Sequence, residues 1–131
     1  MKRVKKTYKI IVLLILTLLT INVKANNQDA ITRSCIDSPS NNQSVGNTMV
    51  IQGWVMSKTA NTEVKVYIDN QEEEIDRVKR PDVIKAITNF GTEIENPNPG
   101  YYKVTDIKNL PYGKHTMYVK VLKNDQVILN D

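Results

Sequence analysis

The sequence predicts an all-β fold, a β-sandwich of about seven strands that one short helical excursion interrupts. Three observations support this prediction. Short runs of alternating apolar and polar residues recur along the chain, clusters of Asn, Asp, Ser, Pro and Gly separate them, and a single segment breaks the alternation. The predicted strands lie within roughly 95 residues, a length that suits one domain with a modest core.

The first 25 residues are typical of a signal peptide and are not expected to join the domain. Lys or Arg occupies five of positions 2–9, the apolar run Ile10–Ile21 follows, and Val23-Lys24-Ala25 offers a cleavage site before Asn26. The apolar run is short against the roughly 20 residues that a helix needs to span a bilayer. We therefore predict a cleaved signal peptide at residues 1–25, with a retained membrane anchor as the alternative.

The signal peptide also accounts for the basic character of the whole chain. The chain has 18 Lys and Arg against 14 Asp and Glu, a formal net charge of +4. Six of these cations and none of the acids lie in residues 1–25, so residues 26–131 carry a net charge of −2. No nucleic-acid partner is therefore expected, and membrane contact is expected only through the leader before cleavage.

Residues 26–34 are polar and aperiodic and are predicted to form a flexible tether, so the domain is expected to span residues 35–131. Cys35 is the only cysteine, which excludes an intrachain disulfide. It lies 14 residues after Ile21, too far from the apolar run for a lipid-anchored N-terminus. Cys35 is expected to be a small buried hydrophobe, with an intermolecular disulfide as the alternative.

Three runs with strand character open the domain. Ser34–Asp37 is short and ends at the turn-forming residues Ser38–Asn42. Met49–Met56 alternates two sets of side chains, and Glu63–Asp69 has the clearest alternation in the chain. Asp69-Asn70-Gln71 predicts a hairpin turn, because Asp and Asn tolerate a left-handed backbone.

The chain is then expected to return antiparallel over Glu73–Val78 and to leave the sheet over residues 79–100. Pro81 can open a helical turn, and Asn96–Gly100 is rich in turn-forming residues. This segment is predicted to be a short helix or loop that lies over the sheets. Its apolar residues fall on one helical face: Val83, Ile84, Ile87 and Phe90.

Three further strands complete the prediction, at Tyr101–Ile107, His115–Lys123 and Gln126–Leu129. The turns Leu110–Lys114 and Asn124-Asp125 separate them. About seven short strands with regular turn signals favour an immunoglobulin-like sandwich within the all-β class.

Six short motifs stand out along the predicted domain: Ile36-Asp37-Ser38-Pro39, Gly53-Trp54, Val64–Asn70, Arg80-Pro81-Asp82-Val83, Gly100-Tyr101-Tyr102 and Leu110–Thr116. In this order they resemble a family of bacterial Ig-like modules found in exported proteins, often beside cell-wall amidases, glucosaminidases and peptidases. The resemblance covers nearly all of the chain after the signal peptide and implies work at the cell envelope. The chain departs from the family at Asp69-Asn70, where Asp-Gly is usual, and in having no catalytic domain beside the module.

Arg80-Pro81-Asp82-Val83 is the first candidate binding motif. The Arg80 guanidinium and the Asp82 carboxylate, two residues apart, can clamp a polar ligand such as a glycan or a peptide carboxylate. The structural alternative, which we favour, is that Asp82 accepts backbone N–H groups at the start of the helical turn while Arg80 pins the excursion to the sheet.

Trp54, the only tryptophan, is the second candidate. It lies on the strand face opposite Ile51 and Val55, where an exposed indole could stack on a sugar ring. The alternative that we favour is that the excursion covers Trp54, with Arg80 over the indole.

Metal binding and catalysis are not expected, and no cofactor is predicted. Alternation sends Glu72 and Glu74 to one strand face and Glu73 to the other, which disfavours a calcium site. A Cys35–His115 nucleophile pair is formally possible, and a zinc site would need ligands that the chain hardly has.

A small sandwich without a deep cleft would offer a Glu93–Glu95 carboxylate pair little shelter from water, so the protein is predicted not to be an enzyme. Tyr112, just before the penultimate predicted strand, resembles a tyrosine corner, whose hydroxyl bonds to nearby backbone. That role would be structural.

Together these observations predict a secreted, non-catalytic Ig-like module that acts at the bacterial cell envelope as a binding or spacer domain. The expected partners are peptidoglycan, a cell-surface glycan or an envelope protein. Two alternatives stay open. One is a truncated accessory fragment of a larger cell-wall hydrolase, and the other is a small exported inhibitor or adhesin that adds a strand to a free sheet edge.

Overall fold

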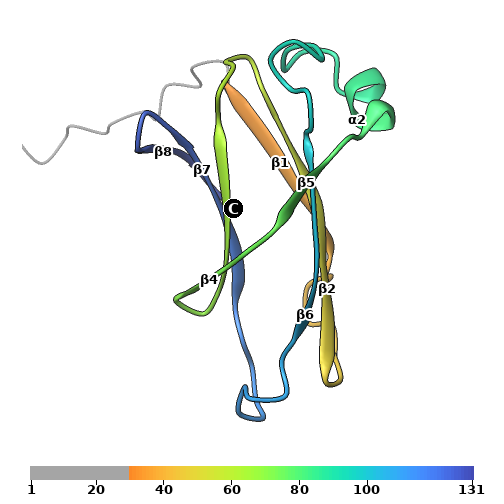
Figure 1. Cartoon of the computed structure of the whole chain (residues 1–131), viewed down its shortest axis with the longest axis vertical. Helices are drawn as coiled ribbons and strands as arrows, with labels where there is room; N and C mark the ends of the chain where they lie inside the picture. Colours follow the sequence, from red (N-terminus) through yellow and green to blue (C-terminus); the bar gives the residue numbers. More distant parts are fainter. Residues whose placement is uncertain (1–29) are drawn as a thin grey trace, which may run out of the picture.

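The computed structural model describes residues 30–131, so the predicted signal peptide and the first residues of the predicted tether lie outside the described part. Figure 1 shows the described part as strands in two layers with one short helix. In chain order the elements are β1 (Thr32–Ser38), β2 (Thr48–Ser57), β3 (Glu63–Ile68), β4 (Gln71–Glu73), β5 (Asp76–Val78), α2 (Pro81–Ala86), β6 (Gly100–Asp106), β7 (Met117–Lys123) and β8 (Gln126–Asn130).

The strands form two antiparallel four-stranded sheets that pack as a sandwich. Sheet A has the strand order β1-β2-β6-β5, and sheet B has the order β4-β3-β7-β8. The predicted all-β sandwich with one helical excursion is therefore confirmed. In Figure 1, α2 projects at one end of the sandwich and the β6–β7 connection lies at the other. Within the described range, no helix has the length and hydropathy needed to span a bilayer.

The predicted strand Glu73–Val78 is wrong, because the chain divides this segment between the two sheets. β4 pairs with β3 in sheet B, whereas β5 pairs with β6 in sheet A. Ile75, which lies between β4 and β5, packs against the core and carries the chain from one sheet to the other. The hairpin turn before β4 is as predicted, since Asp69 adopts a left-handed φ of 55°.

The bounds of β1 and β7 also differ from those predicted. β1 begins at Thr32, inside the predicted tether, because the Thr32 side chain is buried and its hydroxyl oxygen lies 3.1 Å from that of Ser57 on β2. β7 begins at Met117, two residues later than predicted, since His115 takes part in the turn that precedes the strand.

The main core lies between the sheets and consists of the inward-facing side chains of β2, β3, β6 and β7. Val66 lies opposite Val119 and Val64 lies opposite Val121, so β-branched pairs of neighbouring strands face the core together. Full burial of one such side chain contributes about 1.5–3 kcal/mol. The buried members are Met49, Ile51, Val55, Val64, Val66, Ile68, Tyr101, Val119 and Val121.

The second half of β2 is buried on its outer face as well. Trp54 and Met56 point away from the main core and form a second cluster with Val83 of α2. The excursion therefore covers the outer face of sheet A at this end, as the sequence predicted. Partly buried side chains complete the cluster: Cys35, Ile84, Ile87 and Phe90.

Tyr101 joins β6 to β1 through the core. Its side chain is fully buried, and its hydroxyl donates to the Cys35 carbonyl oxygen at 3.2 Å. The ring crosses Gly53 of β2, where a Cβ would overlap both the Tyr101 hydroxyl and the Cys35 carbonyl. Position 53 thus requires glycine for this close approach.

Replacing Gly53 with alanine is expected to lower the free energy of unfolding by about 1–3 kcal/mol, because the added methyl group overpacks the core. Urea denaturation followed by circular dichroism measures the change. Gly46→Ala is the matched control, since a Cβ at position 46 meets nothing within 4 Å. Equal unfolding free energies for the two variants would show that Tyr101 does not pack on Gly53.

Candidate functional site

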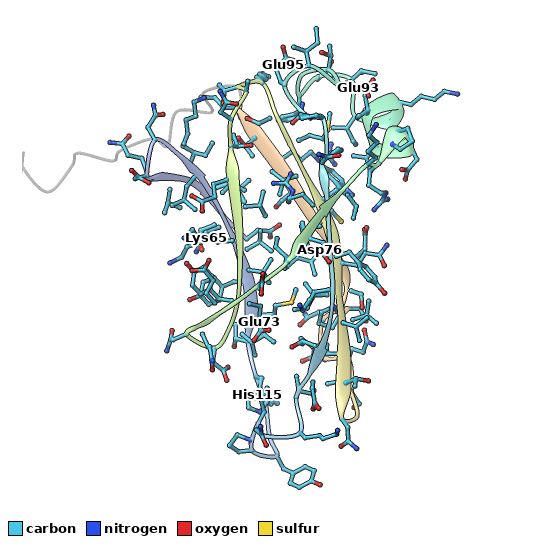
Figure 2. All side chains as sticks on the ribbon, viewed as in Figure 1. Lys65, Glu73, Asp76, Glu93, Glu95 and His115 are labelled. Atoms are coloured by element: carbon cyan, nitrogen blue, oxygen red, sulfur yellow. The ribbon has the colours of Figure 1, made fainter. Side chains whose placement is uncertain are left out.

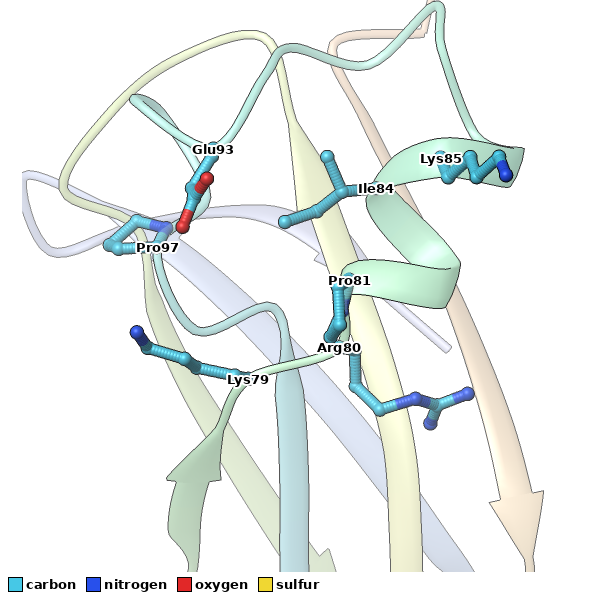
Figure 3. A pocket seen from close by; sticks show the side chains of 7 residues that line it. All are labelled: Lys79, Arg80, Pro81, Ile84, Lys85, Glu93 and Pro97. Atoms are coloured by element: carbon cyan, nitrogen blue, oxygen red, sulfur yellow. The ribbon is translucent and has the colours of Figure 1, made fainter.

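A pocket of about 320 Å³ opens at the end of the sandwich that carries α2 (Figure 3). Its walls are the β5–α2 connection, α2 and the loop that follows α2. All of its lining residues belong to the excursion that the sequence predicted at residues 79–100. They are Lys79, Arg80, Pro81, Ile84, Lys85, Glu93 and Pro97.

Apolar and charged groups share this pocket. In Figure 3 the Ile84 side chain points from α2 into the space between α2 and the loop, and the Glu93 carboxylate points from the loop toward Pro97. The Lys79 side chain extends along the Pro97 side of this space, whereas the Lys85 side chain points away from it. A ligand in the pocket would therefore meet an aliphatic wall, one carboxylate and one ammonium group.

The Lys79 ammonium and the Glu93 carboxylate form no ion pair with any residue of the described part. Three other cations of the described domain are paired: Lys65 with Glu63 and Glu72, Lys108 with Asp106, and Arg80 with Asp37 and Asp82. Lys85, which also lines the pocket, has no ion pair within residues 30–131 either. Two opposite charges that border the same pocket are thus available to a ligand.

The Arg80 guanidinium turns away from the pocket (Figure 3). Its Nε lies 3.0 Å from Asp82 Oδ1, its Nη2 donates to Asp82 Oδ2 at 2.8 Å, and its Nη1 donates to Asp37 Oδ2 at 3.1 Å. The hydrogen bond from Arg80 lowers the pKa of the Asp82 carboxyl, with smaller contributions from the backbone amides of Val83 and Asp82. Arg80 therefore pins the excursion to β1, the role that we favoured from the sequence.

Trp54 lies beneath the excursion and is only 9% exposed. It packs with Met56 and Val83, so its indole has no free face for a sugar ring. The predicted covering of Trp54 is observed. The expected cation–π contact with Arg80 is not, since in the described part Lys58 over Phe90 and Lys120 over two tyrosines make the contacts of this kind.

Asn96, which the sequence marked only as a turn residue, anchors the loop wall of the pocket. Its buried side chain pairs with the backbone of Ser57, with Oδ1 accepting from the Ser57 N–H at 2.7 Å and Nδ2 donating to the Ser57 carbonyl at 3.0 Å. Nδ2 also lies 3.1 Å from the carbonyl oxygens of Phe90 and Thr92. One amide side chain thus fixes the loop both to β2 and to itself.

The rest of the loop is shaped by Gly91 and Glu95. Gly91 has a φ of +86°, and a Cβ there would overlap the Ser57 carbonyl oxygen. The Glu95 carboxylate accepts from the Thr92 amide at 2.7 Å and from its hydroxyl at 2.8 Å. These bonds, the amide bond first, lower the pKa of Glu95. Glu95 is occupied in the turn, and Glu93 alone faces the pocket.

The acidic stretch that follows β3 is spread over different contacts. Glu72 pairs with Lys65, and Glu73 accepts from the Thr105 hydroxyl at 3.0 Å. Within residues 30–131, no group of three or more His, Cys, Asp and Glu side chains is placed to hold a metal ion.

His115 and Cys35 do not interact. His115 Nδ1 lies 2.8 Å from Asp69 Oδ2, and His115 Nε2 lies 2.8 Å from the Pro111 carbonyl oxygen, so both ring nitrogens are engaged elsewhere. Figure 2 shows His115 at the end of the sandwich opposite Glu93 and Glu95. Burial first, and then the nearby Asp37, raises the pKa of the Cys35 thiol, which disfavours the thiolate form that a nucleophile needs.

Tyr112 is fully exposed, so the predicted tyrosine corner at this position is wrong. Tyr101 instead supplies a buried hydroxyl that bonds to distant backbone. The sequence places both tyrosines beside a turn, and only the packing of β6 against Gly53 distinguishes them.

The outer face of sheet B carries an aromatic pair with its own contacts. The rings of Tyr67 and Tyr118 lie opposite each other on β3 and β7 and stack with centroids 5.1 Å apart. Lys120 Nζ lies 5.0 Å from the Tyr67 centroid and 5.5 Å from that of Tyr118. These contacts cover the rings, so the pair stabilises the sheet and is not an open platform for a sugar.

A scan of protein-family models, a search of curated proteins and a search of solved structures each find no match to this chain. The resemblance to Ig-like modules of exported proteins therefore stays a prediction.

Replacing Asn96 with alanine is expected to lower the free energy of unfolding by about 1–3 kcal/mol, because the backbone N–H and carbonyl of Ser57 lose their partners in a buried site. Thermal and urea denaturation measure the loss. Asn98→Ala is the matched control, since Asn98 lies on the same loop with an exposed side chain. Indistinguishable stabilities would contradict the anchoring role of Asn96.

The His115–Asp69 pair is expected to make stability depend on pH. The hydrogen bond to Asp69, followed by that to Pro111, raises the pKa of His115, and the bond from His115 lowers the pKa of Asp69. The contribution of His115 is thus fully present below its unfolded pKa of about 6.5 and is lost as the pH rises through its raised folded pKa. The contribution of Asp69 disappears only in acid, as the pH falls through its lowered pKa.

The variant His115→Gln should therefore lose more stability relative to wild type at pH 5.5 than at pH 8.5. Urea denaturation of both proteins at the two pH values measures the two differences. A difference that does not change with pH would argue against a charged His115 in the folded protein.

Proposed function

We propose that this chain is an exported, non-catalytic immunoglobulin-like module that binds at the bacterial cell envelope through the pocket beside α2. The pocket carries this proposal, because it combines apolar and charged groups between two fixed walls. Asn96, which does not line the pocket, fixes one wall to the sandwich, and the Arg80 guanidinium, which turns away from the pocket, fixes the other.

The strand order supports the immunoglobulin-like part of the proposal. In such sandwiches four strands named A, B, E and D form one sheet, and C, F and G form the other. Sheet A, with the order β1-β2-β6-β5, corresponds to A-B-E-D. Sheet B corresponds to C, F and G as β3, β7 and β8, with the short β4 added at its edge.

The envelope part of the proposal is supported by the sequence. Residues 1–25 have the charge and hydropathy pattern of a signal peptide, and the six motifs resemble modules found beside cell-wall hydrolases. The non-catalytic part is supported by the engagement of the candidate catalytic groups, because His115 and Glu95 are both held in structural hydrogen bonds.

Preformed walls favour binding, since a ligand does not have to order the loop that it contacts. Asn96 holds one wall to β2, and Arg80 holds the other to β1 through Asp37. At about 320 Å³ the pocket falls within the range of roughly 300–1,000 Å³ that is usual for small-ligand sites.

The test is co-sedimentation of the secreted protein with purified peptidoglycan sacculi. Wild type is expected to pellet with the sacculi, and Lys79→Ala or Glu93→Gln should weaken binding by about tenfold each, the usual effect of losing one charge-assisted contact. Lys114→Ala is the matched control, because Lys114 is an exposed lysine next to His115 at the opposite end of the sandwich.

Wild-type protein that stays in the supernatant would overturn the envelope-binding function and favour a spacer or an accessory fragment of a hydrolase. Binding that survives both pocket substitutions would show that another surface makes the contact. Trp54→Ala and Arg80→Ala are unsuitable for this test, since both side chains hold the excursion in place.

A further inference from the structure

We infer that the pocket binds a short zwitterionic peptide, with the peptide carboxylate at Lys79, its ammonium group at Glu93 and an aliphatic side chain against Ile84. This inference rests on the proposed function, because it assigns a ligand class to the same pocket. It selects the peptide part of an envelope polymer over its sugar part.

The charges of the pocket are the first argument. Lys79 and Glu93 border one cavity, are not paired with each other and have no other ion-pair partner in the described part of the chain. A neutral ligand would leave both charges to solvent. A ligand that carries one positive and one negative group can satisfy both at once with charge-assisted hydrogen bonds.

The apolar wall is the second argument. Pro81, Ile84 and Pro97 line the space between the charged groups. Such a surface suits a small aliphatic side chain, which gains about 0.8 kcal/mol per buried methylene group. Stacking on a sugar ring needs an aromatic face instead, and none of the seven lining residues is aromatic.

The aromatic groups elsewhere in the described domain do not change this assignment. Trp54 lies under α2 with 9% of its surface exposed. Tyr67 and Tyr118 stack on each other on the outer face of sheet B, under the Lys120 ammonium. Tyr102 and Tyr112 are exposed but do not line the pocket, so a glycan chain would find no free ring at the pocket itself.

The size of the pocket is the third argument. A volume of about 320 Å³ is at the lower end for ligand sites and suits a short peptide more than a long chain. Peptidoglycan offers both charges, because its stem peptides carry free carboxyl groups and the side-chain amine of a diamino acid beside small aliphatic side chains. Its glycan strands offer hydroxyl and acetamido groups, which do not match a pair of opposite charges.

The experiment is a titration of the secreted wild-type protein with trialanine, followed by calorimetry and by the backbone amide spectrum. Trialanine is expected to bind and to shift the amide signals of residues 79–85 and 93–97. N-terminal acetylation or C-terminal amidation of the probe should each weaken binding by about tenfold, since each removes one charge-assisted contact. A tetramer of N-acetylglucosamine is the competing probe and should leave these signals unchanged.

Two variants test which pocket residue contacts each end of the peptide. Glu93→Gln should make binding insensitive to N-terminal acetylation while amidation still weakens it, and Lys79→Ala should show the reverse. A folded amide spectrum for each variant shows that the pocket is intact, and the blocked peptides test the same point on wild type without any substitution.

The results also distinguish this inference from the proposed function. No shift with trialanine, equal binding of free and blocked peptides, or pocket shifts with the sugar tetramer would each overturn the peptide assignment, even where sacculi are bound. Trialanine binding in the pocket without retention on sacculi would support the peptide assignment and overturn the envelope function.

Discussion

The second half of β2 is buried on both faces, and this constraint determines the arrangement of the rest of the domain. Its inner side chains join the core between the sheets, while Trp54 and Met56 on the outer side need a second cover. Leaving a tryptophan on a sheet face exposed to water would lose the stabilisation that comes from burying its large apolar surface. The excursion between β5 and β6 supplies the cover through Val83 of α2. The segment that interrupts the strand pattern therefore covers the apolar outer side chains of β2.

A cover made of six helical residues and a loop has little stability of its own and must be attached to the sandwich. Arg80 attaches its start to β1 through Asp37, and Asn96 attaches its end to the backbone of Ser57. Between these two attachments the β5–α2 connection, α2 and the following loop enclose the pocket among themselves. The binding site that we propose is thus a consequence of covering β2, and its walls are fixed by the same contacts that stabilise the cover.

The sequence predicted the sandwich, the hairpin at Asp69 and the covering of Trp54, because each depends on local alternation, turn chemistry or an apolar face. It did not predict the division of residues 73–78 between two sheets, since alternation does not tell which partner strand a segment meets. The anchoring role of Asn96 and the place of Glu93 in the pocket lining could not be recognised either. An Asn in a turn-forming run has the same sequence pattern whether its side-chain amide faces water or the backbone of Ser57. Whether the Glu93 carboxylate borders a pocket depends on residues of α2 and of the β5–α2 connection, which the local sequence does not place. The sequence assigned the buried, backbone-bonded tyrosine to position 112, whereas the structure has it at position 101, because burial of a tyrosine depends on residues distant in the sequence.

Acrylamide quenching of tryptophan fluorescence reports whether α2 covers Trp54, since Trp54 is the only tryptophan in the chain. In wild type the indole should be poorly quenched. Val83→Asp should make it readily quenched while the circular dichroism of the sandwich persists, because a buried carboxylate would lift α2 from β2. Ile94→Asp, at a position that is 84% exposed, should leave quenching unchanged. Equal protection of Trp54 from acrylamide in wild type and in a folded Val83→Asp protein would show that α2 does not cover Trp54.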